Sequence, residues 1–346
     1  MSERGTYAAA GVDIDAGEAA VELMKPWVAK ASRPEVVGGL GGFAGLFALD
    51  LSRWRKPLLA SSTDGVGTKL AIAQALDKHD TIGLDLVAMV ADDLVVCGAE
   101  PLFLQDYVAC GKVVPERLAE IVSGIAEGCR QAGCALVGGE TAEHPGMLGP
   151  TEYDVAGTAV GIVESDALLG PDRVAVGDVI LALGSSGLHS NGFSLVRHVL
   201  ADMPLTDVVD ELSAPLGEAL LTPTRIYSKD CLALAAATEV HAFAHVTGGG
   251  LAANLARVLP AGVDAMLDRS SWRPAPIFDL VARVGRIEPA ECERTFNMGV
   301  GMVAVLPPAA VDGALALLAE REVPAWVAGE IVAGTGAARL VGSHSD

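Results

Sequence analysis

The chain of 346 residues is acidic, with 44 Asp and Glu residues against 24 Lys and Arg and a formal net charge of −20. This balance excludes nucleic acid as a general partner, because binding to a phosphate backbone needs a basic face. The length exceeds that of one ordinary core, and a hydrophobic fraction of 51% excludes a disordered chain. We therefore expect two globular domains. A nucleotide ligand is compatible with the charge, because metal ions can bridge its phosphates to carboxylates.

None of the six cysteines belongs to a C-x-x-C pair, and most lie within apolar stretches. This pattern predicts buried free thiols rather than a zinc site or a disulfide framework. The first fifteen residues contain no apolar run typical of a secretory signal, and no stretch is long and apolar enough to span a bilayer. We expect a cytoplasmic protein without a membrane partner.

Residues 1–57 are rich in glycine and irregular, apart from a helix expected at residues 16–31. The glycines of residues 38–43 predict a mobile loop. Strands alternate with helices from Leu58 onward, and this alternation indicates an α/β or α+β domain over residues 58–168. The expected elements of this domain are a helix that starts near Thr68, helices at 83–97 and 115–132, and strands at 58–63, 101–109, 135–137 and 155–163.

Residues 168–177 are the best candidate for a linker, because Gly, Pro and Asp interrupt the apolar pattern there. A second α/β domain is expected over residues 178–346. Its expected elements are helices at 193–200, 224–237, 249–258 and 308–320, and strands at 179–183, 240–246, 299–306, 326–332 and 338–342.

Three common nucleotide and nucleophile motifs are missing from the chain. No segment fits a phosphate-binding P-loop, since Gly67-Thr68-Lys69 has letters of that motif in the wrong order. Residues 39–44 and 299–304 have G-x-G-x-x-A spacing, but the first segment lacks a preceding strand and the second leads into a strand. No G-x-S-x-G elbow occurs either. Any nucleotide must therefore be bound by another design.

The segment from Ser61 to Lys69 places a carboxylate at a strand end, two glycines in a turn and a lysine in the first turn of a helix. Backbone N–H groups at that helix start can face an anion, Asp64 can hold Mg²⁺, and Lys69 can neutralise phosphate charge. The alternative is an ordinary strand-turn-helix with a surface Asp-Gly pair.

The helix expected at residues 83–97 is apolar except for Asp85, Asp92 and Asp93. Asp85 and Asp92 are seven residues apart and therefore share a face of the helix. Carboxylates on a buried helix are costly unless they are paired or bound to cations. Metal coordination is one explanation, and an ion pair with Lys69 or another base is the other.

Four further segments are rich in glycine and polar residues within apolar surroundings. Each of them alone is more often a structural turn. Because all four adjoin strand ends, where α/β proteins form ligand sites, together they predict a binding site. These segments are residues 138–143, 184–192, 245–250 and 295–299.

Taken together, these segments resemble the phosphoribosylformylglycinamidine cyclo-ligase family. The resemblance covers nearly the whole chain in order, and the full set is specific although single motifs are shared with a wider superfamily. That superfamily also holds formylglycinamidine ribonucleotide synthetase, selenophosphate synthetase, thiamine-monophosphate kinase and a hydrogenase-maturation protein. The matching segments are residues 7–17, 41–43, 63–69, 79–85, 98–103, 138–143, 185–192, 221–227, 245–250 and 294–301.

The resemblance implies a two-domain α/β fold in which N-terminal sheets form a dimeric β-barrel and the C-terminal domain is an α/β sandwich. It also implies a homodimeric ligase of purine biosynthesis. Such an enzyme converts formylglycinamidine ribonucleotide and ATP to 5-aminoimidazole ribonucleotide, ADP and phosphate, after ATP has phosphorylated the formyl oxygen. The runner-up is another small-molecule kinase of the superfamily, and a non-enzymatic scaffold is a third alternative.

The resemblance further implies the roles of single residues. Asp64 and Asp93 would hold Mg²⁺, with Asp85 as a further candidate ligand, and Lys69 would meet the ATP phosphates. The candidate catalytic residues are Lys69 and, for proton transfer, His245 or His189, because imidazole titrates near neutral pH. Asp92 stands where the family often has Asn, which leaves the number of Mg²⁺ ions open. The expected ATP-binding residues are Lys25, Gly41, Gly42, Asp64, Gly65, Gly67, Thr68, Lys69, Gly138, Gly139 and Glu140. The expected substrate-binding residues are Ser186, His189, Ser190, Asn191, Thr247, Gly248, Gly249 and Asn297.

Overall fold

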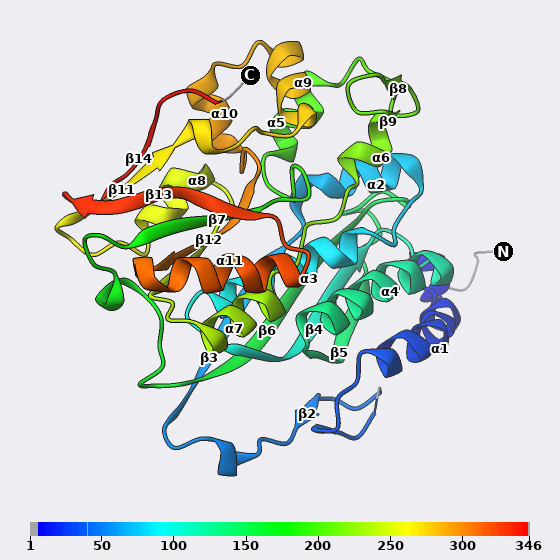
Figure 1. Ribbon diagram of the computed structural model, residues 1–346. Helices are drawn as coiled ribbons and strands as arrows, with labels where there is room; N and C mark the ends of the chain where they lie inside the picture. The colour runs from blue at the N-terminus through cyan, green and yellow to red at the C-terminus, as the bar shows by residue number, and fades with distance from the viewer. Residues whose placement is uncertain (1–5, 40, 345–346) are drawn as a thin grey trace.

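The computed structural model describes residues 6–39 and 41–344, so Leu40 of the predicted glycine-rich loop lies outside the described residues. Its main feature is a pair of β-sheets, one of four strands in the N-terminal half and one of six strands in the C-terminal half (Figure 1). The described part of the chain contains no helix that is long and apolar enough to cross a membrane.

The N-terminal sheet has the strand order β3-β6-β4-β5, in which β4 and β5 are parallel and the other pairs are antiparallel. Helices α3 and α4 cover one face of this sheet, and α1 packs against α4 beside the edge strand β5. The strands are β3 Pro57–Gly65, β4 Glu100–Cys110, β5 Ala135–Glu143 and β6 Tyr153–Glu164. The helices are α1 Ile14–Lys30, α2 Leu70–Leu76, α3 Ile82–Val95 and α4 Pro115–Ala132, and the short strands β1 Val36–Val37 and β2 Leu46–Phe47 follow α1.

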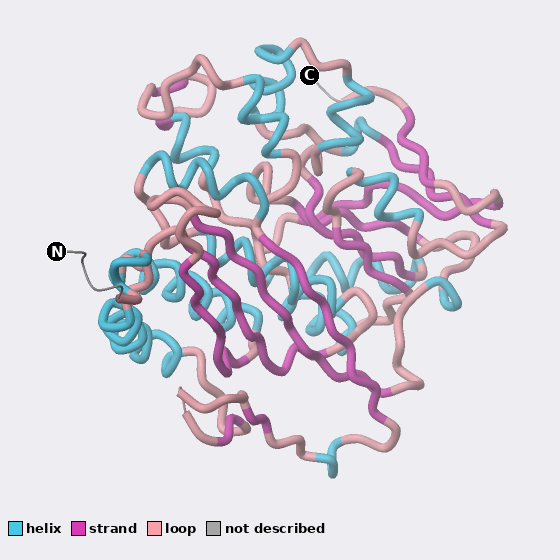
Figure 2. The backbone as a smooth tube through the Cα atoms, turned by 180° about the vertical axis from the view of Figure 1, so that it is seen from behind, coloured by secondary structure: helices cyan, strands magenta, loops and turns pink. Residues whose placement is uncertain are grey.

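The other face of the N-terminal sheet has no helix over it among the described residues, as the view from behind shows (Figure 2). Large apolar side chains are exposed on this face, with Leu59 of β3 at 65% and Tyr107 of β4 at 40%. A sheet face of this kind with exposed apolar side chains is typical of a surface that binds another protein.

The C-terminal sheet has the strand order β10-β12-β7-β13-β11-β14. Its strands are β7 Val179–Gly184, β10 Ala242–His245, β11 Val263–Asp268, β12 Val300–Leu306, β13 Ala325–Ala333 and β14 Ala338–Val341. The helices of this half are α5 Phe193–Val199, α6 Leu216–Leu220, α7 Ser228–Ala237, α8 Gly250–Ala256, α9 Pro276–Gly285, α10 Pro289–Thr295 and α11 Val311–Glu320. A small hairpin of β8 Val208–Val209 and β9 Ala214–Pro215 precedes α6.

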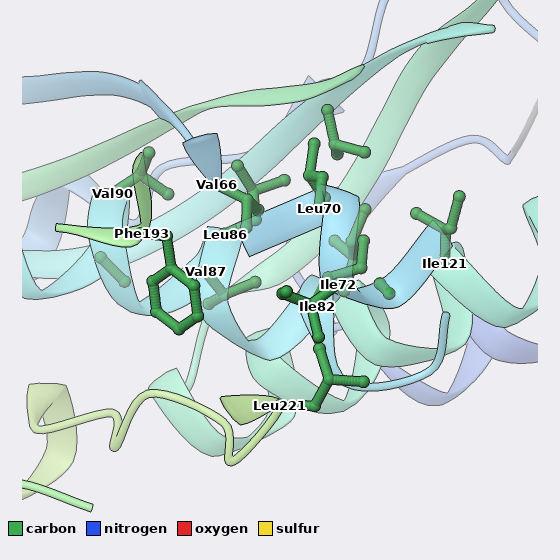
Figure 3. Close-up of a cluster of buried hydrophobic side chains, with 14 of the residues drawn as sticks. Val66, Leu70, Ile72, Ile82, Leu86, Val87, Val90, Ile121, Phe193 and Leu221 are labelled. Carbon is green, nitrogen blue, oxygen red and sulfur yellow. The ribbon is translucent and has the colours of Figure 1, made fainter. Parts of the chain in front are cut away.

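One hydrophobic cluster joins the two halves of the molecule. Leu86 and Val87 of α3 belong to it together with Phe193 of α5 and Leu221, which come from the C-terminal half (Figure 3). Because these side chains are buried against one another, the loops that precede α5 and α7 are held on the N-terminal domain.

Most of the expected elements are present, and α4 has the predicted bounds. The expectation of free thiols is confirmed, since all six cysteines are free and five of them are buried. Two expectations are wrong. Residues 138–143 are part of strand β5 rather than a loop, because their backbone pairs with β4, and the helix expected at 224–237 begins only at Ser228. Elements that were not expected are strand β11, helices α6, α9 and α10, and the short strands β1, β2, β8 and β9.

Candidate functional site

The end of strand β3 forms one wall of a pocket of about 420 Å³. Asp64, Gly67 and Thr68 are exposed there, and Asp64 Oδ1 accepts a hydrogen bond of 2.7 Å from the N–H of Gly65. The opposite wall is formed by the loop before α5, with Ser190 and Asn191. The structure therefore brings the predicted phosphate turn and part of the predicted substrate loop to one pocket.

A second pocket, of about 290 Å³, lies beside the C-terminal part of α3 and contains Asp93 and His245. His245 Nδ1 lies 2.9 Å from Asp93 Oδ1, and His245 Nε2 is buried without a partner in the described structure. Because the carboxylate accepts, Nδ1 donates, and in the neutral ring the lone pair is on Nε2. His245 therefore has the form of a base that is oriented by a carboxylate.

The glycine loop after His245 is organised by Asn254 of α8, which the sequence did not single out. Its buried Nδ2 lies within 3.2 Å of the carbonyl oxygens of Thr247, Gly248 and Gly250. A Cβ on Gly248 would lie 3.5 Å from Asn191 Oδ1, so this loop and the loop before α5 are neighbours. The only sequence signal for Asn254 was a single polar residue in an apolar helix.

His189 has a different environment from His245. It is 1% exposed, its φ of +62° lies in the left-handed region, and its Nε2 accepts from the N–H of Ser186 at 3.2 Å. Burial lowers the pKa of His189 well below its usual value, and the positive charges of neighbouring side chains lower it further. The ring is therefore neutral near pH 7, with its proton on Nδ1, which is also buried and has no partner in the described structure.

Lys69 is enclosed by protein groups and does not line any of the pockets described here. It is fully buried, and its Nζ donates to Asp85 Oδ1 at 2.9 Å and to the carbonyl oxygens of His189 and Thr222 at 3.1 and 2.7 Å. An ammonium group has three donors, so none is left for a nucleotide. Burial lowers the pKa of Lys69, and the charge of Asp85 opposes this shift.

Asp85 is accordingly found in an ion pair, one of the two arrangements that the sequence left open. Its Oδ1 also accepts from the N–H and Oγ1 of Thr224, while Oδ2 is buried without a partner. Asp92 is fully buried as well and accepts from the N–H of Tyr227 and the hydroxyl of Ser228. Burial raises the pKa of Asp92 to about 6, although His245 and the hydrogen bonds from Ser228 and Tyr227 oppose this.

The other predicted ATP-binding residues lie around α1, beside strand β5. A pocket of about 700 Å³ between α1, α4 and β5 is lined by Gly138, Gly139 and Glu140. An adjoining pocket of about 300 Å³ is lined by Lys25 and by glycines of the 38–45 loop. Gly41 and Gly42 are exposed in that loop.

The lining of the large pocket also includes Asp106 of β4, which the sequence did not single out. Its carboxylate lies against Gly139, where a Cβ would meet Oδ1 at 2.2 Å. Burial raises the pKa of Asp106 to about 7. In the sequence, Asp106 interrupts the apolar run of β4, and this was the available signal.

Two of the predicted substrate-binding residues make structural contacts instead of facing a pocket. Asn297 is 4% exposed, with Nδ2 bonded to the carbonyl oxygen of Gly187 at 2.9 Å and Oδ1 accepting from the N–H of Gly299 at 2.8 Å. Ser186 is exposed, but its hydroxyl donates to the carbonyl oxygen of Pro223 at 2.6 Å and accepts from the N–H of Arg225 at 3.1 Å. Both residues therefore fix the shape of the loop.

Comparison with known proteins gives the relatives of the chain. The family models named AIR synthase related protein, N-terminal domain and C-terminal domain, match residues 49–163 and 175–341. The phosphoribosylformylglycinamidine cyclo-ligase of Anaeromyxobacter sp. (strain Fw109-5) is 56% identical over 335 residues, which are 96% of this chain and 97% of that protein. The chain belongs to the phosphoribosylformylglycinamidine cyclo-ligase family.

Other cyclo-ligases support the same assignment. Those of Brevibacillus brevis (strain 47) and Geobacillus thermodenitrificans (strain NG80-2) are 54% and 49% identical, over 96% and 98% of this chain and 97% and 99% of those proteins. The chain is accordingly an enzyme, a ligase of purine biosynthesis, and the resemblance found in its sequence is confirmed.

Solved structures share the fold at low identity. Thiamine-monophosphate kinase from Stenotrophomonas maltophilia has a TM-score of 0.68 at 20% identity, with 94% of this chain and 96% of that chain covered. The hydrogenase maturation protein HypE in complex with ATP has a TM-score of 0.60 at 21% identity, with 91% and 88% covered. These likenesses confirm a mixed α/β fold of two domains.

Proposed function

We propose that this cyclo-ligase closes the imidazole ring of 5-aminoimidazole ribonucleotide in the cytoplasm, from formylglycinamidine ribonucleotide and ATP. The identity of 56% over nearly the full length to a protein named for this reaction carries the proposal. The formyl oxygen attacks the γ-phosphorus and ADP leaves. A nitrogen of the substrate then attacks the activated carbon, and phosphate departs as the C–O bond breaks.

The chain's own residues supply orientation and proton transfer in this scheme. Ring closure releases a proton from nitrogen, and His245 is the better candidate to accept it, because Nε2 carries the lone pair and Asp93 fixes the ring. His189 is neutral and is held by Ser186, so its Nδ1–H suits donation to a substrate oxygen. We assign the loops at 186–191 and 247–249 to the ribonucleotide.

The proposed nucleotide site includes Mg²⁺, which would neutralise phosphate charge. Asp64 is exposed and the Asp93 side chain is 43% exposed, so both carboxylates can reach a cation that phosphate oxygens and water also bind. The described residues contain no cluster of three or more His, Cys, Asp or Glu side chains that could hold a metal by itself. Two carboxylates fit a metal ion that binds as a complex with the nucleotide, because the phosphates supply the other ligands.

The proposed ATP-binding residues form two separate groups in one chain. Asp64 on β3 and Gly139 on β5 belong to one row across the sheet, with β6 and β4 between them, which places them about 14 Å apart at the usual strand spacing. Helices α3 and α4 fill the covered face between the two groups. We therefore propose a homodimer in which each ATP site takes one group from either chain.

The uncovered face of the N-terminal sheet supplies a surface for this dimer. Pairing two such faces would bury Leu59 and Tyr107 and close the two sheets into a barrel. We propose residues 58–168 as the domain that binds ATP and dimerises, residues 1–57 as the segment that closes over ATP, and residues 178–346 as the C-terminal domain.

Purified protein mixed with formylglycinamidine ribonucleotide, Mg²⁺ and ATP tests the proposed reaction. We expect aminoimidazole ribonucleotide and ADP in equal amounts. Release of ADP without the ring product would instead indicate a related kinase, and absence of both turnover and ATP binding would indicate a scaffold.

The Asp64→Ala variant tests the proposed role of Asp64. We expect turnover to be abolished, because the carboxylate that holds the Mg²⁺–phosphate group is lost. Asp172→Ala, at an exposed aspartate of the linker, is the matched control and should keep normal activity. Near-normal turnover of the Asp64→Ala variant would refute the assignment.

A further inference from the structure

Helix α3 carries two fully buried carboxylates that lie on one face. Asp85 and Asp92 are both 0% exposed and are seven residues apart, which is close to two helical turns. A buried carboxylate is strongly destabilising unless charge or hydrogen bonds compensate it. The hydrogen-bond donors that compensate these two carboxylates therefore show which part of the chain helix α3 binds.

Both carboxylates bind the same short segment of the C-terminal half. Residues 222–227 form neither helix nor strand, so their backbone groups need other partners. Asp85 Oδ1 accepts from the N–H of Thr224 at 2.8 Å and from its hydroxyl at 2.6 Å. Asp92 accepts from the N–H of Tyr227 at 2.9 Å and from the hydroxyl of Ser228 at 2.7 Å.

The spacing of the two carboxylates matches the segment. Seven residues of α-helix rise about 10.5 Å, and three residues of extended chain, as from Thr224 to Tyr227, span up to about 10 Å. Two acids at this spacing can therefore each take one backbone N–H of a chain that runs along the helix. A single acid would leave one end of the segment free.

The segment in turn holds the loop at residues 184–190. The hydroxyls of Ser190 and Thr224 are 3.1 Å apart, and the hydroxyl of Tyr227 donates to the carbonyl oxygen of Gly184 at 2.8 Å. Ser186 bonds to the backbone of the segment, and Lys69 bridges the carbonyl oxygens of His189 and Thr222. Every one of these contacts fixes backbone or hydroxyl groups next to the proposed ribonucleotide site.

We propose that Asp85, Asp92 and Lys69 are positioning residues that lock the 184–190 loop in its substrate-binding shape. The assignment of that loop to the ribonucleotide rests on the proposed function. All three side chains are fully buried and bind protein groups, so we expect their loss to weaken ribonucleotide binding and to leave the affinities for ATP and Mg²⁺ unchanged. We refer to these three residues below as the α3 clamp.

The Thr224→Val variant tests the α3 clamp without a buried charge being removed. It deletes the hydroxyl that bonds Asp85 and Ser190 but keeps the size and the backbone N–H. We expect the KM for formylglycinamidine ribonucleotide to rise about tenfold or more, since a hydrogen bond to a charged group is worth ~1.5 kcal/mol or more. The KM for ATP and the Mg²⁺ concentration for half-maximal activity should stay within about twofold.

Two companion variants distinguish positioning from general damage. Thr224→Ser keeps the hydroxyl and should restore the KM of the wild type, and Thr238→Val makes the same exchange at the end of α7, away from the loop, and should be neutral. The Lys69→Met/Asp85→Leu double variant replaces the ion pair by apolar side chains of similar size, which is tolerated in other buried pairs. It should reproduce the ribonucleotide defect. A rise in the KM for ATP or in the Mg²⁺ requirement in either test variant would overturn the proposal.

Hydrogen–deuterium exchange keeps this test separate from the proposed reaction. In the ligand-free protein we expect the amides of residues 184–190 to exchange about tenfold faster in the Thr224→Val variant than in the wild type. If the exchange is faster in the variant but the wild-type protein makes no aminoimidazole ribonucleotide, the α3 clamp is supported and the proposed reaction is refuted. Unchanged exchange in an active enzyme would refute the clamp.

Discussion

At the scale of single residues, the same side-chain type has different roles according to its surroundings. Asp64 and Asp93 are open to pockets, whereas Asp85 and Asp92 are enclosed and accept hydrogen bonds from the segment before α7. The sequence showed that acids on an apolar helix need compensation, but it could not show which partner provides it. That choice depends on Thr224, which is 139 residues from Asp85 along the chain.

The buried carboxyl group of Asp106 should make the free energy of unfolding depend on pH. Burial raises its pKa to about 7 in the folded protein, against about 3.9 in an unfolded chain. Between these values the unfolded state releases the proton first, so the free energy of unfolding falls as pH rises from about 4 to 7, by ~1.4 kcal/mol per pH unit at most. Below and above this window the contribution is constant.

The Asp106→Asn variant removes this titration. We expect its stability relative to the wild type to increase between pH 4.5 and 7.5, as measured by urea unfolding at a series of pH values. All other groups titrate in both proteins, so the difference isolates Asp106. A difference that does not change with pH would show that water in the pocket solvates the carboxylate.

At the scale of elements, the ends of helices could be predicted from nearby residues in the sequence. The pairing of strands that are distant in the sequence could not. Helix α4 begins with Pro115 at its first position and is followed by Gly133, whose φ is +83°, so both of its ends are marked in the sequence. Strand β5 was predicted to end before Gly138, because glycine favours turns, but pairing with β4 extends it to Glu143. Helix α9 has Pro276 at its start and apolar residues on one side, a signal that was available and missed.

The contact between α3 and α4 depends on glycine. A Cβ on Gly83 of α3 would lie 2.1 Å from the backbone nitrogen of Ile125 in α4. We expect Gly83→Ala to destabilise the protein by about 2 kcal/mol or more through overpacking, although alanine favours helix over glycine by about 1 kcal/mol. Gly17→Ala in α1 is the matched control, because no atom lies within 4 Å of its Cβ position, and it should stabilise. Thermal unfolding of both variants measures the effect, and equal shifts would contradict it.

At the scale of the whole molecule, the family could be predicted from the sequence, but the spatial arrangement of the proposed ATP-binding residues could not. Lys25 and residues 138–140 lie on the β5 side of the N-terminal sheet, and Asp64 lies on the β3 side. In the proposed scheme, one chain therefore holds two partial ATP sites. In the proposed homodimer, a second copy would complete these sites by pairing with the exposed sheet face that carries Leu59 and Tyr107.

Mixing two inactive variants tests whether each site is shared between chains. In an Asp64→Ala/Lys25→Ala heterodimer, one site would carry both substitutions and the other would be intact. Equal amounts of the two variants, unfolded and refolded together, give half heterodimers, so we expect about a quarter of the wild-type activity. If every ATP site were built within one chain, each site would keep one substitution and the mixture would be as inactive as its components. Light scattering on the same samples checks that both variants remain dimers, so loss of association cannot produce the negative result.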